Sequence, residues 1–285
     1  MGLLAALLPI VLIALPLYLF GRANVTDQDV AWFSGAGFSG SGFSRSAPSV
    51  DEASVYRRYL TRHRQHRLFG GLFGTVFAAL VGIRLYQSVT IGIIEDGLPL
   101  ADIWFCALAG IMVGALSAEL FRMNEPPSDT IAASLAERGV EPSAPLILIA
   151  RGLAATALLA ATAIAVTSGS FDALGIAVLG ALLASVAERT RQAVSNRRRP
   201  LLSESAKAVD IRIRTFALDS VTQLQVSAAL LVAAWVASKF PDTEVAVVDA
   251  AQFVVVMGCL IASVVTLRRA RPYPPRGWAE QQVAA

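Results

Sequence analysis

Apolar runs that finish in arginines constrain this chain more than any other feature. Residues 171–200 show the pattern: Asp172 stands near the start, small and aliphatic residues follow through Ala187, and five arginines close the run. The same order of acid, apolar run and arginine recurs over residues 102–122 and 249–271. Because charges are costly in the bilayer core, each run predicts a helix in lipid with its arginines at one membrane surface.

The composition agrees with a membrane protein. Of 285 residues, 55% are hydrophobic and only 16% are charged, whereas soluble domains average about 25% charged residues. Arginine supplies 22 of the 24 basic residues, which together with abundant alanine indicates a GC-rich bacterial genome. We therefore expect a multi-pass protein of the bacterial cytoplasmic (inner) membrane.

Seven apolar segments are candidates for membrane spans, since about 20 residues cross the hydrocarbon core. They cover residues 3–20, 68–94, 103–121, 144–167, 173–187, 221–240 and 250–267. The fifth has only 15 residues and spans only if its helix continues into Asp172 and Glu188. The first lacks the preceding positive charge of a signal peptide, so we interpret it as an anchor.

The arginines also predict the topology. Segments 21–67, 188–220 and 268–285 are basic and belong inside, whereas the short connections 95–102, 168–172 and 241–249 carry acids and belong outside. The mixed linker 122–143 is inside by parity. We expect an all-α membrane bundle of seven transmembrane helices, one N-terminal helix plus three hairpins, with the N-terminus out and the C-terminus in.

This topology divides the chain into five regions. They are an N-terminal transmembrane anchor (1–20), a flexible Gly/Ser/Phe cytoplasmic linker (21–50), a basic amphipathic interfacial helix (51–67), a six-helix membrane bundle (68–267) and a cytoplasmic tail (268–285). The linker is a disordered tether or a set of adhesive aromatic residues, Phe33, Phe38 and Phe43. The segment 203–220 is expected as a surface-lying or docking helix.

Two basic clusters are candidate contacts for anionic lipid at the cytoplasmic face or for a partner. The amphipathic helix has Val55, Tyr56, Tyr59 and Leu60 on one side and is basic elsewhere. The candidate contact residues are Arg57, Arg58 and Arg62 on this helix and Arg197, Arg198 and Arg199 after the fifth span. A positive-inside loop explains the second cluster without nucleic acid.

Small residues four apart predict where helices pack, because lipid gives no hydrophobic drive between helices. Such rows occur in four segments: Gly70, Gly74, Ala78 and Gly82; Cys106, Gly110, Gly114 and Ala118; Ala173, Ala177, Ala181 and Ser185; and Ala229, Ala233 and Ala237. Tight helix contacts are therefore expected, with little room for a wide aqueous channel.

Ionisable residues within or at the ends of spans are where function is sought. We expect Glu119 to pair with Arg151 near the inner face and Arg84 to pair with Asp102 or Glu95 near the outer face. Alternatively, both arginines extend to the nearest interface without a partner.

The sequence predicts no enzyme. It contains no P-loop, no H-E-x-x-H and no G-x-S-x-G. His63 and His66 have H-x-x-H spacing but stand among arginines, so we expect a solvated surface rather than a metal site, and no cofactor. The favoured function is a non-catalytic membrane subunit that scaffolds or assembles with other proteins. The alternative is a small-solute transporter with a polar track of Arg84, Glu119 and Arg151, and a membrane enzyme is a more distant third.

Overall fold

The computed structural model describes residues 24–36, 48–86, 100–121, 144–196, 204–240 and 245–274. All regular structure in these ranges is helical. The order is α2 (Asp27–Ala31), the π-helix η1 (Trp32–Ala36), α3 (Val50–Tyr86), α4 (Leu100–Ala118), α5 (Ala144–Ser168), α6 (Asp172–Ser195), α7 (Glu204–Ala237) and α8 (Ala246–Arg269). The all-α expectation is confirmed for this part of the chain.

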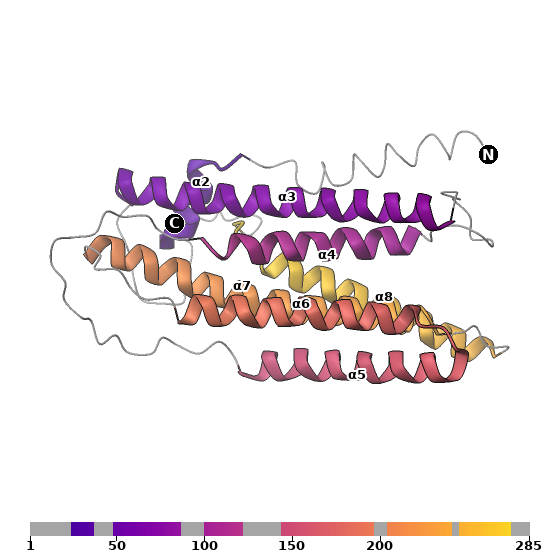
Figure 1. Ribbon diagram of the computed structural model, residues 1–285. Coiled ribbons are helices and arrows are strands. Elements are labelled where there is room, and N and C mark those ends of the chain that lie inside the picture. Colours follow the sequence, from indigo (N-terminus) through magenta and orange to yellow (C-terminus); the bar gives the residue numbers. More distant parts are fainter. Residues whose placement is uncertain are drawn as a thin grey trace.

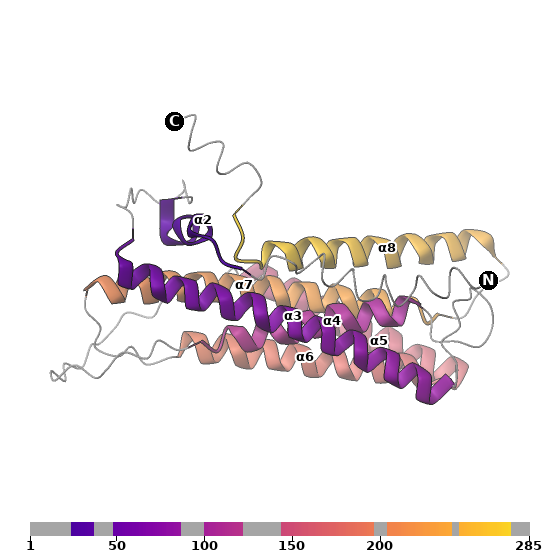
Figure 2. The same cartoon turned by 90° about the horizontal axis from the view of Figure 1, so that it is seen from above.

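The six long helices lie side by side and alternate in direction (Figures 1 and 2). Helices α3, α5 and α7 begin at the end of the bundle where α4, α6 and α8 finish (Figure 1). The described arginine-rich stretches of α3, α6, α7 and α8 therefore gather at one end, which we call the arginine end. The short turn between α5 and α6 lies at the opposite end.

Within the described ranges, four helices are long and apolar enough to cross a membrane: Pro145–Ser168, Asp172–Ser195, Ala206–Ala237 and Ala246–Arg269. The short fifth segment does continue as helix through Asp172 and Glu188, which gives it a length of 24 residues. The apolar helix Ile103–Ala118 is shorter. The expected span 68–94 is helical as far as Tyr86, and segment 3–20 lies outside the described residues.

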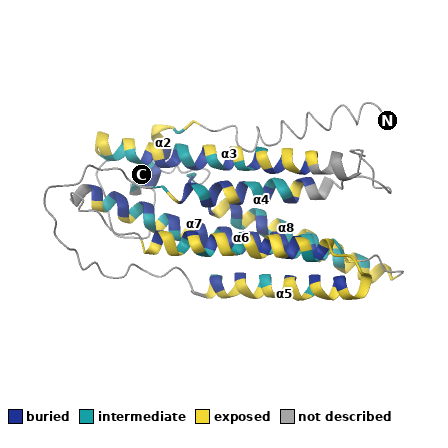
Figure 3. Cartoon of the chain, viewed as in Figure 1, coloured by how far each residue is buried: buried dark blue, intermediate teal, exposed yellow. Residues whose placement is uncertain are grey.

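The outer faces of these helices are apolar, as a lipid-facing surface requires. In α8 only 11% of the most apolar stretch is buried, and Val247, Phe253 and Val254 are each at least 66% exposed. The outward surface of α5 is similarly exposed along its length (Figure 3). Contiguous apolar surface of this extent is rare on soluble monomers, and hydrocarbon is the solvent that stabilises it.

Helices α3 and α4 meet through the predicted glycine rows. A Cβ atom at Gly70 would overlap the carbonyl group of Gly110, and one at Gly74 would overlap that of Cys106. At Gly114 the overlap would be with the carbonyl of His66. The two backbones thus touch directly, and only glycine permits this approach.

A second small-residue contact joins α5, α6 and α7. Ala173 and Ala177 of α6 are buried against Ala157 and Ala161 of α5, together with Val232 of α7. The first two residues of the expected row on α6 therefore pack against neighbouring helices, whereas Ala181 and Ser185 are exposed. Small side chains at this contact let the helix backbones approach closely, as expected where lipid gives no hydrophobic drive between helices.

Helices α3 and α7 extend past the bundle at the arginine end, where α2 lies against the start of α3 (Figures 1 and 2). We call this region the headpiece: α2, η1, residues 50–67 of α3, residues 204–220 of α7, and the short segments 119–121 and 270–274. Its core consists of Val30, Trp32, Phe33, Tyr56, Tyr59, Leu60, Val209 and Ile213.

The headpiece changes two expectations. Residues 51–67 are the first turns of α3, continuous with the apolar turns that follow, and their apolar side packs on protein rather than on a lipid surface. Residues 204–220 likewise continue without a break into the apolar part of α7. Two amphipathic segments that are far apart in the sequence cover each other's apolar faces, which removes the need for a bilayer surface.

Candidate functional site

A cluster of buried polar side chains lies where the headpiece joins the bundle. Helix α3 contributes Tyr59, His63 and Arg67, which are four residues apart and share one face. Glu119 follows α4 directly and reaches the same point. All four residues are at most 2% exposed.

Glu119 has a partner on each carboxylate oxygen. The Tyr59 hydroxyl donates to Oε2 at 2.7 Å, and His63 Nε2 lies 3.0 Å from Oε1. The imidazole N–H is not directed straight at Oε1, so this contact is a close polar approach rather than a linear hydrogen bond. The His63 ring is enclosed by the rings of Tyr59 and Phe216, whose centroids lie 4.9 and 6.2 Å away.

These contacts favour the ionised form of Glu119. Burial alone would raise the pKa of Glu119, but the adjacent His63 and the hydrogen bond from the Tyr59 hydroxyl outweigh it. The pKa of Glu119 is therefore lower than its usual value of 4.5. A buried carboxylate is held as an anion at neutral pH.

Arg67 fastens α3 to the C-terminal end of α8. Its Nη2 donates to the carbonyl oxygen of Ala270 at 2.5 Å, and the Ser220 hydroxyl donates to the same oxygen at 3.2 Å. Burial, followed by repulsion from Arg271, lowers the pKa of Arg67 to about 10, and Glu119 opposes this decrease. Arg67 thus remains a buried cation at neutral pH, which joins α3, α7 and α8 at one carbonyl group.

Arg64 fastens α2 to α3 in the same way. Its Nη2 lies 2.9 Å from Asp29 Oδ2, and its Nη1 donates to the carbonyl oxygen of Asn24. Asp29 accepts in addition from the backbone and hydroxyl of Thr26, at 2.8 Å each, which caps α2. The guanidinium group of Arg64 stacks 4.3 Å from the ring centroid of Tyr273.

The expected ion pairs are replaced by others. Arg151 lies 3.3 Å from Glu188, which also pairs with Arg191 at 2.6 Å, whereas Glu119 faces His63. The expectation of a Glu119–Arg151 pair therefore needs correction. Its basis was the order of the helices in the chain, but α5 packs on α6 and α7.

The side chains of the second expected pair, Arg84 and Asp102, lie outside the described residues, as do Glu95, Phe38, Phe43, Arg197, Arg198 and Arg199.

The two histidines have separate environments. His63 is fully buried, so the expected solvated surface is wrong for this residue. His66 Nδ1 lies 2.7 Å from the Ser117 hydroxyl, and burial, with repulsion from Arg62 and His63, lowers the pKa of His66. Among the described residues, no three His, Cys, Asp or Glu side chains are placed to hold a metal ion.

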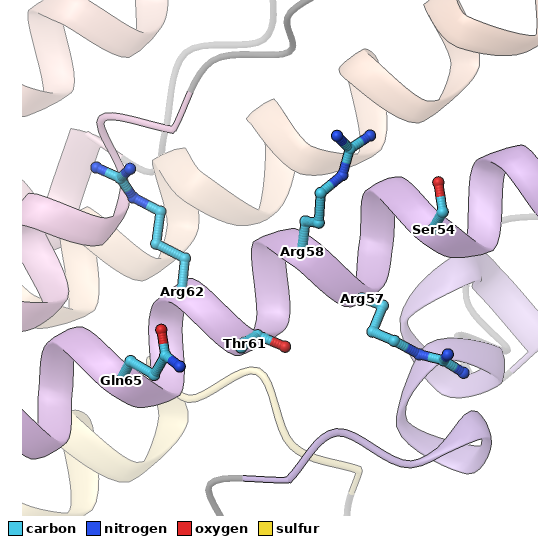
Figure 4. Close-up of a pocket in the computed structure, with 6 residues that line it drawn as sticks. All are labelled: Ser54, Arg57, Arg58, Thr61, Arg62 and Gln65. Carbon is cyan, nitrogen blue, oxygen red and sulfur yellow. The ribbon is translucent and has the colours of Figure 1, made fainter.

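The remaining described candidates, Phe33, Arg57, Arg58 and Arg62, belong to the headpiece. Phe33 is buried against Tyr56, Tyr59 and Phe216 and therefore serves the core of this chain rather than a partner. The side of α3 that faces away from the headpiece core forms an open groove of about 630 Å³ (Figure 4). It is lined by Ser54, Arg57, Arg58, Thr61, Arg62 and Gln65.

Sequence reasoning missed Tyr59, His63 and Arg67 as a polar row, although a signal was present. The predicted apolar side of the helix, with Tyr56, Tyr59 and Leu60, continues at helical spacing into His63 and then Arg67. A histidine and an arginine in line with an apolar face indicate buried polar groups that need partners.

Comparison with protein-family models, with curated proteins and with solved structures gave no match.

Proposed function

We propose that this chain is a non-catalytic integral membrane subunit that scaffolds or assembles with other membrane or membrane-associated proteins through its headpiece. The observation that carries the proposal is the construction of the headpiece. It is continuous with α3 and with α7, of which α7 is long and apolar enough to cross a membrane, and it is held by internal polar contacts of Glu119, Arg64 and Arg67. A head fixed in this way presents a rigid surface at a defined height above the membrane.

The buried cluster supports a structural role rather than chemistry. Its acids face cations or hydroxyl groups of the same chain, and the side chains of Glu119 and His63 are 0% exposed. A general acid or base must reach its substrate within hydrogen-bond distance, which a fully enclosed pair cannot do.

The proposed placement is a bacterial cytoplasmic membrane with seven spans and the arginine end, with the headpiece, inside. The gathering of arginines at one end supports this orientation under the positive-inside rule. The transporter alternative has less support, because Glu119 and Arg151 have different partners and do not form one polar track.

Site-specific photo-crosslinking in native membranes tests the proposal. The exposed headpiece residue Ile211 on α7 would carry the crosslinker, and the exposed membrane residue Val254 on α8 would serve as the control. We expect one protein adduct of defined mass from position 211, in near-stoichiometric yield, and the same protein after purification in mild detergent. If the purified chain is monomeric and neither position gives a protein adduct, the scaffold proposal is wrong.

A further inference from the structure

We infer that the outer face of α3 binds an anionic phospholipid, with the phosphate group at Arg58 and Arg62 and the acyl chains on Phe69 and Phe73. The inference rests on the membrane placement in the proposed function, but not on any protein partner. It combines a basic groove with an apolar stripe on the same face of one helix.

The groove supplies the donors for a phosphate. Arg58 and Arg62 extend to the same side of α3, while Arg57 points elsewhere (Figure 4) and pairs with Asp27. Arg58 is exposed. Arg62 is partly buried: its Nη2 donates to the carbonyl oxygen of Ser117 at 3.1 Å and its Nε is enclosed, so a phosphate would meet the remaining edge of the guanidinium group. Guanidinium groups bind phosphate with strong, charge-assisted hydrogen bonds.

Around the arginines are smaller polar groups. The side chains of Ser54, Thr61 and Gln65 line the same groove. They add hydroxyl and amide groups to the two guanidinium groups without adding a negative charge. The described lining is therefore net positive, which favours an anionic headgroup over a zwitterionic one.

The apolar stripe starts where the groove ends. Residues 58, 62, 65, 69, 73 and 76 follow one another at intervals of three or four and so share a helix face. Phe69 is 65% exposed, Phe73 is 72% exposed, and Phe73 stacks on Phe77 with a centroid distance of 6.3 Å. This surface has hydrocarbon character directly in line with the arginines.

The heights of the two parts match a lipid. Arg62 contacts Ser117, one residue before the end of α4, so the arginines stand where an apolar helix ends. At 1.5 Å per residue, Phe69 lies about 10 Å deeper than Arg62. A phosphate at the arginines would place acyl chains on the phenyl rings. A soluble phosphate or an acidic peptide segment would use the arginines without contacting these rings.

Native mass spectrometry of the full-length chain in mild detergent tests the inference. The probes are phosphatidylglycerol, phosphatidylcholine with the same acyl chains, and inorganic phosphate. We expect phosphatidylglycerol to bind at least about 10-fold more tightly than phosphatidylcholine. The double variant Arg58→Gln/Arg62→Gln should weaken phosphatidylglycerol binding about 30-fold, since each interfacial arginine contributes roughly a factor of five.

Matched variants separate this site from general charge effects. Arg189→Gln removes an exposed arginine of α6, which also lies at the arginine end of the bundle, and should leave the phosphatidylglycerol affinity unchanged. Arg58→Gln alone keeps the Arg62–Ser117 contact and should still lose about fivefold. Phe69→Ala/Phe73→Ala should weaken phosphatidylglycerol binding without affecting the partner adduct at position 211.

Three results would overturn the inference. One is equal affinity of the double variant and the unsubstituted chain. Another is equal binding of phosphatidylcholine, or displacement of the lipid by millimolar inorganic phosphate, which would assign the groove to a soluble anion. The third is a photo-crosslinker at Thr61 that captures a protein rather than lipid in native membranes. Failure to find a protein partner would contradict the proposed function and leave the lipid measurements unaffected.

Discussion

Among single residues, Glu119 is the one on which the join between headpiece and bundle depends most. Replacing it by Gln keeps the size of the side chain but removes the negative charge beside His63 and near Arg67. Leaving a buried polar group without its partner costs about 1–3 kcal/mol. We therefore expect Glu119→Gln to lower the free energy of unfolding by that amount, measured by denaturant unfolding in detergent with tryptophan fluorescence.

An exposed pair in the same headpiece provides the control. Asp27 is 90% exposed and pairs with Arg57, so Asp27→Asn should change the stability little. Equal decreases in the free energy of unfolding for the two substitutions would show that Glu119 contributes no more to stability than an exposed pair.

The titration of Glu119 and His66 predicts that acid loosens the headpiece. His66 has a lowered pKa, so the folded state resists its protonation, and stability decreases once the pH falls below the ordinary value of 6.5. Glu119 also has a lowered pKa. Its contribution is present above 4.5 and is lost as the pH falls through the folded-state value.

Thermal unfolding measured between pH 7.5 and 3.5 checks this dependence. The midpoint should decrease in two stages, and the later stage should be absent from Glu119→Gln. A midpoint that is constant or rises toward pH 4 would contradict it.

At the scale of elements, the α3–α4 crossing depends on glycine. In Gly74→Ala or Gly110→Ala the new methyl group meets a backbone carbonyl, so the helices must separate. Overpacking of this kind costs about 1–3 kcal/mol. At Gly152 of α5 and Gly258 of α8, an added methyl group would meet no other atom within 4 Å, so alanine there should gain up to about 1 kcal/mol of helix propensity.

Thermal unfolding of the four single variants in detergent measures the contrast. The two crossing variants should unfold at lower temperature than the unsubstituted chain and the other two at the same or higher temperature. The same sign at all four positions would show that the close backbone contact is not a source of stability.

The elements also show how far sequence reasoning reaches. The glycine rows predicted both faces of the α3–α4 contact, because small residues four apart have few other uses in a membrane helix. Periodicity predicted the apolar side of residues 51–67 but not what covers it. Tyr56 and Tyr59 would suit a lipid surface as well as a protein one, and their cover, Val209 and Ile213, lies about 150 residues later.

The polar site was harder to predict than the fold. The partner of a charged residue depends on which helices pack together, and hairpin order does not give this. Glu119 precedes the linker 122–143 and Arg151 follows it, yet Arg151 pairs with Glu188 of α6. The burial of His63 is explained by the position of Glu119 beside it, which the order of residues in the chain does not give.

At the scale of the whole molecule, the orientation in the membrane is the property that the arrangement of arginines predicts. Arginine-rich loops remain on the cytoplasmic side because their translocation is disfavoured. Since α3 and α7 begin at the arginine end, residue 52 in the headpiece and residue 170 in the α5–α6 turn should lie on opposite sides. Native Cys106 and Cys259 would first be replaced by Ser or Ala.

Labelling of intact cells with a membrane-impermeant maleimide then decides the orientation. We expect Ser170→Cys to react in intact cells and Glu52→Cys to react only after permeabilisation. Reaction of Glu52→Cys alone would reverse the orientation and place the headpiece and the phospholipid site on the outer surface. Reaction of both in intact cells would mean that the helices between them do not all cross. The labelling pattern therefore decides on which side of the membrane the arginine end lies, and from which side a partner can approach it.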